Sequence, residues 1–257
     1  MLNTKSRTLL KTLLPSGLVA TKSWLITQGL SLHFIDNAVK NRTLVPLAVG
    51  VYVRDTIQVS WQGVIASLQR MSDIPLHVGG LTALDIAGLS HYQSRAKVAL
   101  VALYSSEPLP TWLHRIELNA RFSWYSTKRL WPASVMENSP FMQENQWQPS
   151  LPPMFYSTPE MAMLELLANV PDSVSFEHAD QLMQGMSTLS PRRLNVLLKA
   201  CRSIKIKRLF MWLAQRHNHA WLKYLTPDSY DFGSGKREIA KSGRLDRTWS
   251  ITVPKEL

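Results

Sequence analysis

The chain has 257 residues, and its 45% hydrophobic content can build one large or two modest folded cores. Its formal net charge is +11, and no apolar run approaches the roughly 20 residues that a bilayer-spanning helix needs. Residues 1–14 alternate polar and apolar side chains at helical spacing, unlike a signal core. Because Cys201 is the only cysteine, no intrachain disulfide can form, and apolar neighbours predict a buried thiol. We therefore expect a globular, cytoplasmic protein without a membrane segment.

The charge is unevenly distributed along the chain. Residues 1–54 hold 7 basic and 1 acidic residues (net +6), residues 55–189 hold 7 and 12 (net −5), and residues 190–257 hold 15 and 5 (net +10). A basic head and tail flanking an acidic middle favour a polyanion-binding protein, because phosphate contacts release counterions and dominate affinity. Net charge alone does not exclude a merely soluble basic protein.

The first 54 residues predict two short helices that pivot on Gly29. The first covers residues 21–28, and Ser31 is placed to cap a second helix over 31–42. Helical spacing predicts a buried face in the second helix with Ile35, Ala38 and Val39. The opposite, polar face then carries His33, Asp36, Asn37, Lys40 and Asn41.

Two β-rich runs follow these helices, at residues 44–48 and 51–54, and Gly50 between them suits a tight hairpin. This order of elements is typical of a winged helix-turn-helix that places its second helix in the major groove of DNA. A helical hairpin with a strand pair and no ligand is the alternative. If DNA is bound, the predicted base contacts come from some of Ser31, His33, Asn37 and Lys40, and the phosphate contacts come from Lys22, Arg42 and Arg54.

The middle of the chain predicts a mixed α/β region over residues 57–157. A helix capped by Ser60 runs to Arg70, and a short strand at 76–78 turns through two glycines into another helix. Apolar residues predict a buried strand over 97–104, and alternation over 115–125 is compatible with a further strand. Residues 137–159, rich in Pro, Gln, Ser and Asn, predict a long surface connection.

The last part predicts a small helical bundle over residues 158–225 and an extended tail over 226–257. Thr158 followed by Pro159 is a typical helix start, and serines introduce three more helices at 175–185, 190–201 and 203–216. The predicted fold class is therefore α+β: an N-terminal winged helix-turn-helix domain (1–56), and a second domain (57–257) in which a mixed α/β part precedes the bundle.

Two motifs suggest chemistry, and neither is complete. Residues 233–237 (Gly-Ser-Gly-Lys-Arg) resemble a phosphate loop, but Tyr230 stands where the first glycine is required and Arg237 replaces the Ser or Thr that binds magnesium. His217 and His219 lack the cysteine or carboxylate partners of a metal site, and Asn218 between them is suited to end a helix in the left-handed conformation. The sequence predicts neither an enzyme nor a cofactor.

A basic stretch over residues 192–216 has two interpretations. It is either the solvated face of the bundle helices or an anion-facing surface. In the second interpretation, the candidate residues are Arg202, Lys205, Lys207 and Arg208, together with Lys236 and Arg237 of the glycine-lysine turn. Such a surface would follow DNA beyond the site read by the second helix, or contact another nucleic acid.

Four passages of the latter half, in combination, resemble one protein family. They are LHVGGLTAL at 76–84, RSIKIKRLF at 202–210, FGSGKR at 232–237, and GRLD at 243–246 leading to ITVP at 251–254. With these passages, the chain resembles the AbiEi antitoxins of bacterial AbiE type IV toxin-antitoxin systems along nearly its whole length. One departure concerns the wing, which commonly carries a basic residue before its glycine, whereas Val49 stands there in this chain.

The resemblance implies two activities. The winged helix would repress its own operon by binding promoter inverted repeats in double-stranded DNA, and residues 57–257 would form an antitoxin domain that neutralises a nucleotidyltransferase-like toxin without a need for stable contact. A winged-helix regulator without antitoxin activity is the alternative. A third reading, a phosphoryl-transfer enzyme, depends only on the incomplete glycine-lysine turn.

Overall fold

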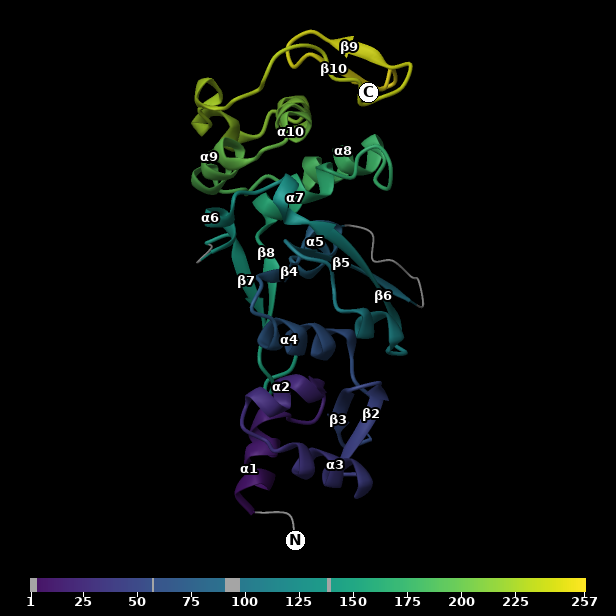
Figure 1. Ribbon diagram of the computed structural model, residues 1–257. Helices are drawn as coiled ribbons and strands as arrows, with labels where there is room; N and C mark the ends of the chain where they lie inside the picture. The colour runs from purple at the N-terminus through teal and green to yellow at the C-terminus, as the bar shows by residue number, and fades with distance from the viewer. Residues whose placement is uncertain (1–3, 57, 91–97, 138–139) are drawn as a thin grey trace.

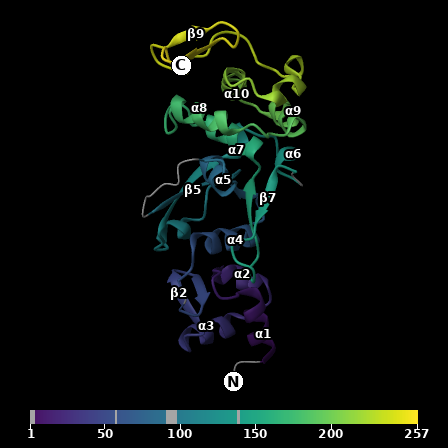
Figure 2. The same ribbon diagram turned by 180° about the vertical axis from the view of Figure 1, so that it is seen from behind.

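The computed structural model describes residues 4–56, 58–90, 98–137 and 140–257. The molecule is elongated, and the chain advances along its long axis from the N-terminal helices to a C-terminal hairpin at the other end (Figure 1). The view from behind shows the same order of layers (Figure 2). None of the helices in these residues has the length and apolar character of a bilayer-spanning segment.

The N-terminal unit has the predicted helix, turn, helix and hairpin, preceded by one more helix. Its elements are α1 (Thr4–Leu13), β1 (Ala20–Thr21), α2 (Lys22–Thr27), α3 (Leu32–Lys40), β2 (Leu44–Ala48) and β3 (Val51–Arg54). The three strands form one antiparallel sheet in the order β1-β3-β2. This layout fits a winged helix-turn-helix in which β2 and β3 are the wing. The short strand β1 was not predicted.

Local side-chain chemistry explains where these helices begin. The hydroxyl of Thr21 accepts a hydrogen bond from the Trp24 amide at 3.2 Å, and Ser31 caps α3 by accepting from the Phe34 amide at 3.2 Å. Gly29 has a φ of +94°, which glycine adopts without steric cost. The predicted cap at Ser31 and the predicted turn at Gly29 are therefore confirmed.

The middle region is a five-stranded mixed sheet in the order β6-β5-β4-β8-β7. Its strands are β4 (Leu76–Val78), β5 (Ala99–Ser105), β6 (Ala120–Ser126), β7 (Met142–Asn145) and β8 (Met154–Ser157). Helix α4 (Trp61–Met71) covers one face, and α5 (Gly80–Ile86) and α7 (Pro159–Leu167) cover the other (Figure 1). The predicted strand over 97–104 corresponds to β5, although Lys97 lies outside the described residues.

The prediction of a surface connection over residues 137–159 is wrong, because β7 and β8 lie there. Strand β8 is internal to the sheet, with Val78 of β4 opposite Tyr156 on one side and β7 paired on the other. Met154 and Ser157 at its two ends are fully buried. Each strand has only four residues, which is too short for alternation to emerge from a segment rich in Pro, Gln and Asn.

The four bundle helices are α7, α8 (Phe176–Gly185), α9 (Pro191–Ala200) and α10 (Ile204–Arg216). As predicted, Ser175, Ser190 and Ser203 cap the last three through their hydroxyl groups. Thr158 occupies the cap position of α7, but its buried hydroxyl makes no hydrogen bond. The tail contains the hairpin of β9 (Arg244–Asp246) and β10 (Ile251–Val253), which packs over α10 through buried Ile251 and Val253.

The central sheet separates two apolar cores. One joins its upper face to the bundle, and the other joins its lower face to α4 and the winged helix. The second core does not stop at residue 56: the Val19 amide donates to the Ser67 hydroxyl at 2.9 Å, and a Cβ on Gly63 would lie only 2.1 Å from the Gly17 carbonyl oxygen. The domain boundary between residues 56 and 57 therefore stays a prediction.

A buried carboxylate links the sheet to α7. Glu165 is fully buried, and its Oε1 lies 2.7 Å from His77 Nε2 of β4. Its Oε2 accepts from the Gly80 amide at 3.1 Å and the Ser157 hydroxyl at 2.9 Å. Gly79 makes this approach possible, because a Cβ there would lie 2.3 Å from Oε2. The burial of Tyr104, together with the charge of Glu165, raises the Tyr104 pKa well above its ordinary value.

We predict that Glu165→Ala lowers the free energy of unfolding by about 3 to 5 kcal/mol, because it leaves three buried donors without their acceptor. Denaturant titration followed by tryptophan fluorescence measures this loss. Glu107→Ala is the control, because its 2.6 Å ion pair with Lys128 is exposed and should contribute about 1 kcal/mol or less. Equal losses in the two variants would refute a special role for Glu165.

Candidate nucleic-acid interface

Helix α3 lies at the N-terminal end of the molecule (Figure 1). Phe34, Ile35 and Ala38 are buried, whereas His33 and Lys40 on its other side are exposed. The predicted division of this helix into an apolar and a polar face is therefore confirmed. The polar face offers hydrogen-bond donors and acceptors of the kind that distinguish base edges in a major groove.

The candidate base-reading residues differ in how free their polar atoms are. The Ser31 hydroxyl is engaged in capping α3, so this residue has a structural task as well. The Asn37 amide nitrogen lies 2.9 Å from His33 Nε2, one helical turn away. This contact holds both side chains at one position on the exposed face, and Asn37 keeps its carbonyl oxygen for other partners.

Lys22 is paired within the protein. Its Nζ lies 2.7 Å from Asp36 Oδ1, so the first residue of α2 is tied to the middle of α3. The hydrogen bond to Asp36 is the main cause of an upward shift in the Lys22 pKa. A phosphate contact by Lys22 would have to share this ammonium with Asp36.

Arg42 occupies an unusual backbone position at the end of α3. Its φ is +55°, its amide donates to the Val39 carbonyl, and the Thr43 amide donates to the Ala38 carbonyl. This is a Schellman end, in which glycine is the favoured residue because the left-handed conformation strains other side chains. Arg42 is exposed, so its guanidinium projects from the end of the candidate reading helix.

Arg54, a predicted phosphate contact, binds groups of its own chain. Its Nε donates to the Leu14 carbonyl at 2.9 Å, one Nη donates to the Ser16 hydroxyl at 3.0 Å, and Asp55 is 3.7 Å away. The guanidinium thus joins β3 to the segment that follows α1. A phosphate contact by Arg54 stays a prediction, and it would have to use the donors that these contacts leave open.

The tip of the wing is apolar and open. Val49 is 88% exposed, and the register shifts between Pro46 and Ala48 where β2 pairs with β3. This tip offers van der Waals contact and lacks a cation that could hold a phosphate.

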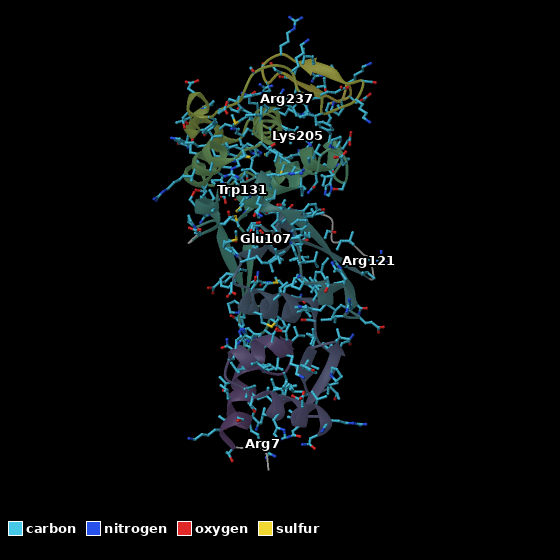
Figure 3. The ribbon with its side chains drawn as sticks, viewed as in Figure 1. Arg7, Glu107, Arg121, Trp131, Lys205 and Arg237 are labelled. Atoms are coloured by element: carbon cyan, nitrogen blue, oxygen red, sulfur yellow. The ribbon has the colours of Figure 1, made fainter. Side chains whose placement is uncertain are left out.

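Sequence reasoning missed two further features of this end. Leu32, the first residue of α3, is 52% exposed, and such a side chain can contact the methyl group of thymine. Its position one turn before Asp36, on the polar face, was the available signal. Helix α1, at the same end (Figure 1), carries the exposed cations Arg7 and Lys11, and Arg7 is labelled in Figure 3.

Two of the six residues predicted for a second, anion-facing surface are buried. Lys207 is 2% exposed and Arg208 is 4% exposed. Arg208 donates to the carbonyl oxygens of Phe232, Gly233, Gly235 and Ser250 at distances of 2.6 to 3.2 Å. Lys207 and Arg208 therefore do not face an anion in solvent. The glycine-lysine turn that resembles a phosphate loop instead directs its carbonyl groups towards Arg208.

The other four residues differ in their surroundings. Arg202 donates to the Lys128 carbonyl at 2.8 Å, and Lys205 donates to the Ala168 carbonyl at 3.3 Å. Burial lowers the Lys205 pKa, and the charge of Asp172 opposes this shift. Lys236 and Arg237 are exposed on the tail. Arg237 and Arg7 lie at opposite ends of the molecule (Figure 3), which disfavours a continuous DNA track along one chain.

The histidines at the end of α10 make protein contacts. His217 Nε2 and Arg216 Nε both lie about 3 Å from Asp180 Oδ1, at 2.9 and 3.0 Å. His219 Nε2 contacts the Met183 carbonyl at 2.7 Å. Asn218 has a φ of +46°, as predicted for the end of a helix. Within the described ranges, no cluster of three or more His, Cys, Asp or Glu side chains could hold a metal ion.

Sequence comparison assigns the chain to a family. The model of the AbiEi antitoxin N-terminal domain of transcriptional regulators matches residues 3–94, and the model of the AbiEi antitoxin transcriptional regulator of type IV toxin-antitoxin systems matches residues 96–254. The chain belongs to the AbiEi antitoxin family. In this AbiEi chain, the two family models meet within the segment between α5 and β5, rather than at the end of the wing.

A solved structure supports the fold of this AbiEi protein. The chain is similar to the crystal structure of the Rv2827c protein from Mycobacterium tuberculosis, with a TM-score of 0.52 and 15% sequence identity. The alignment covers 96% of this chain and 89% of that one. At this identity, the likeness concerns the fold alone. No curated protein matches the chain in sequence.

We predict that Arg208→Leu lowers the free energy of unfolding by about 3 kcal/mol, because the carbonyl groups of the 232–235 turn lose a buried charged donor. Lys236→Ala, on the exposed side of the same turn, should change stability by about 0.5 kcal/mol or less. Thermal and denaturant unfolding of both variants tests this assignment. An unchanged stability of Arg208→Leu would restore Arg208 to the candidate anion-binding residues.

Proposed function

We propose that this AbiEi protein represses its own operon through its N-terminal end and neutralises a nucleotidyltransferase-like toxin through the remainder of the chain. The observation that carries the first part is the exposed polar face of α3 at a basic end of the molecule. His33, Asn37 and Lys40 lie on this face, and Arg42 follows at its end. Inverted repeats in a promoter would then be bound by two copies of the chain, one on each half-site.

Asn37 and Arg42 are proposed to act differently. A bidentate contact between an asparagine and adenine discriminates against other bases by about 1 to 3 kcal/mol. An arginine on a phosphate strengthens binding to every sequence equally. In this proposal, Asn37 within α3 reads the base sequence, and Arg42 at the end of the helix contacts the DNA backbone.

We predict that Arg42→Gly makes the protein more stable and the repressor weaker. Glycine relieves the left-handed strain and should raise the free energy of unfolding by about 1 kcal/mol. Loss of one phosphate contact should weaken operator and unrelated DNA alike, and reduce the slope of log affinity against log salt by about 0.9.

Fluorescence anisotropy over a salt series, with operator and scrambled duplexes, measures both effects. Arg115→Gly is the control, because Arg115 is an exposed arginine in the middle region. An unchanged salt slope for Arg42→Gly would remove Arg42 from the interface.

The second part, toxin neutralisation, is supported by family membership and by the separation of the two basic ends. We do not assign neutralisation to a single basic patch. Two of the predicted cations, Lys207 and Arg208, are buried, and Arg202 and Lys205 donate to carbonyl groups of the protein. Two alternatives are distinguished by one experiment: an antitoxin that also regulates, and a regulator without antitoxin activity.

We predict that the full-length variant Asn37→Ala/Lys40→Ala loses repression but still rescues growth of a bacterial host that expresses the adjacent nucleotidyltransferase-like gene from an independent promoter. Neither substitution touches the cores, so the protein should fold. The wild-type chain is the positive control, and a promoter-reporter assay confirms loss of repression. Failure of the wild-type chain to relieve toxicity would leave only the regulator.

A further inference from the structure

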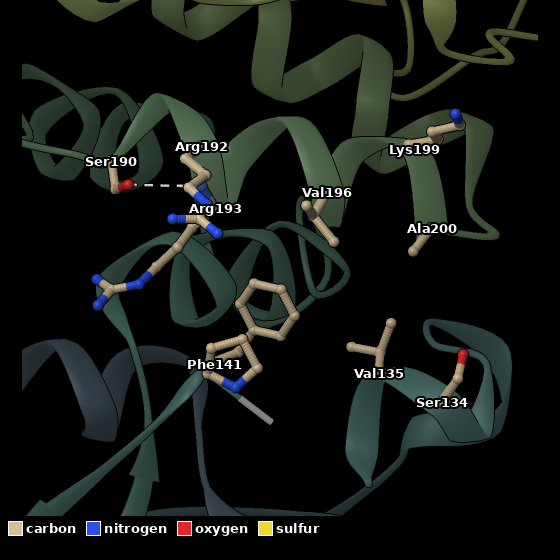
Figure 4. A pocket seen from close by; sticks show the side chains of 10 residues that line it. Ser134, Val135, Phe141, Ser190, Arg192, Arg193, Val196, Lys199 and Ala200 are labelled. Atoms are coloured by element: carbon tan, nitrogen blue, oxygen red, sulfur yellow. Dashed lines mark hydrogen bonds between the residues drawn. The ribbon is translucent and has the colours of Figure 1, made fainter. Parts of the chain in front are cut away.

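A large pocket lies between α9 and the segment that contains α6 (Ala133–Met136) (Figure 4). Its volume is about 990 Å³, at the upper end of the range for small-molecule sites. Among the described residues, the lining consists of apolar, hydroxyl and basic side chains without an acidic one: Ser134, Val135, Pro140, Phe141, Ser190, Arg192, Arg193, Val196, Lys199 and Ala200.

The base of the pocket is apolar. Val135 and Phe141 belong to the bundle core and are 6% and 4% exposed. Val196 and Ala200 extend from α9 towards them across the pocket (Figure 4). Val196 is 49% exposed, whereas Val135 and Phe141 are covered by the protein, so Val196 offers the open apolar surface of the pocket. The face of a flat ring could cover it.

The described side chains of the lining carry a net positive charge, because a buried carboxylate neutralises only one of the three cations. Glu160 is 3% exposed, its Oε1 accepts from the Ser190 amide at 2.7 Å, and its Oε2 lies 3.6 Å from an Nη of Arg193. The carboxylate of Glu160 thus neutralises the charge of Arg193. Arg192 and Lys199 on the same helix are both exposed, and neither is among the hydrogen-bonded or ion-paired side chains of the described residues. Two uncompensated cations remain.

We propose that this pocket binds a small organic dianion, a phosphate monoester whose organic part carries a flat aromatic ring. Arg192 and Lys199 lie about two turns apart on α9, on either side of Val196 (Figure 4), so the phosphate would lie between them and accept charge-assisted hydrogen bonds from both. Ser134 and Ser190 add hydroxyl groups to the lining, the second of which also caps α9, and the exposed Val196 would contact the face of the ring. The site is independent of the proposed DNA contacts, because it lies on the bundle and not on the winged helix.

The test uses the full-length protein and AMP as a probe that has both chemical parts. Isothermal titration calorimetry at low salt should detect saturable binding of AMP. Inorganic phosphate and adenosine, which each carry one part only, should bind at least about tenfold more weakly, a loss of about 1.4 kcal/mol.

The variant Arg192→Gln/Lys199→Gln should weaken AMP binding about tenfold without a change in melting temperature. The matched control Arg244→Gln/Arg247→Gln removes the same charge from two exposed arginines of the C-terminal hairpin and should bind AMP like the wild type.

Three results would overturn the proposal: no detectable binding of AMP, equal weakening by the control pair, or binding of inorganic phosphate as tight as that of AMP. The second and third would indicate attraction of any anion to a basic protein. Each outcome is separate from operator binding and growth rescue, which the pocket variant should retain.

Discussion

The buried carboxylate of Glu165 is the contact on which the arrangement of the two halves depends. It receives hydrogen bonds from β4, from the start of α5 and from β8, while its own helix, α7, leads into the bundle. A buried carboxylate is expensive to desolvate, so it is tolerated only where several donors surround it. This requirement fixes α7 on the upper face of the sheet and explains the glycine at position 79, where any side chain would displace the carboxylate.

The sheet lies between two basic ends. The lower core ties the sheet to α4 and the winged helix, and the upper core ties it to the bundle and tail. The acidic middle of the sequence thus corresponds to the middle of an elongated molecule (Figure 1). Helix α3 and the C-terminal hairpin lie at opposite ends of the molecule (Figure 1). This geometry favours separate partners for the two ends over a single nucleic acid that contacts both.

The sequence predicted those parts that local chemistry determines. The wing bounds, the serine caps, Gly29 and the polar face of α3 all follow from neighbours within a few residues, and they agree with the structure. Strands β7 and β8 could not be predicted in the same way, because their stability comes from pairing with β4 and with each other. The contacts of Arg54 and Arg208 could not be predicted for a related reason. The carbonyl groups to which they donate are 24 to 42 residues away in sequence, so from the sequence alone both arginines look free to bind an anion.

These two arginines show why formal charge overstates the charge available to a ligand. Arg54 and Arg208 donate to carbonyl groups of their own chain, and Lys22 and Arg193 lie beside carboxylates. Arg42 is the opposite case: it is exposed and occupies a backbone conformation that favours glycine. A cation that costs stability where a glycine would fit best is better evidence of a functional contact than a cation that secures a turn. By this criterion, Arg42 supports the proposed DNA-facing end more strongly than the net charge of residues 1–54 does.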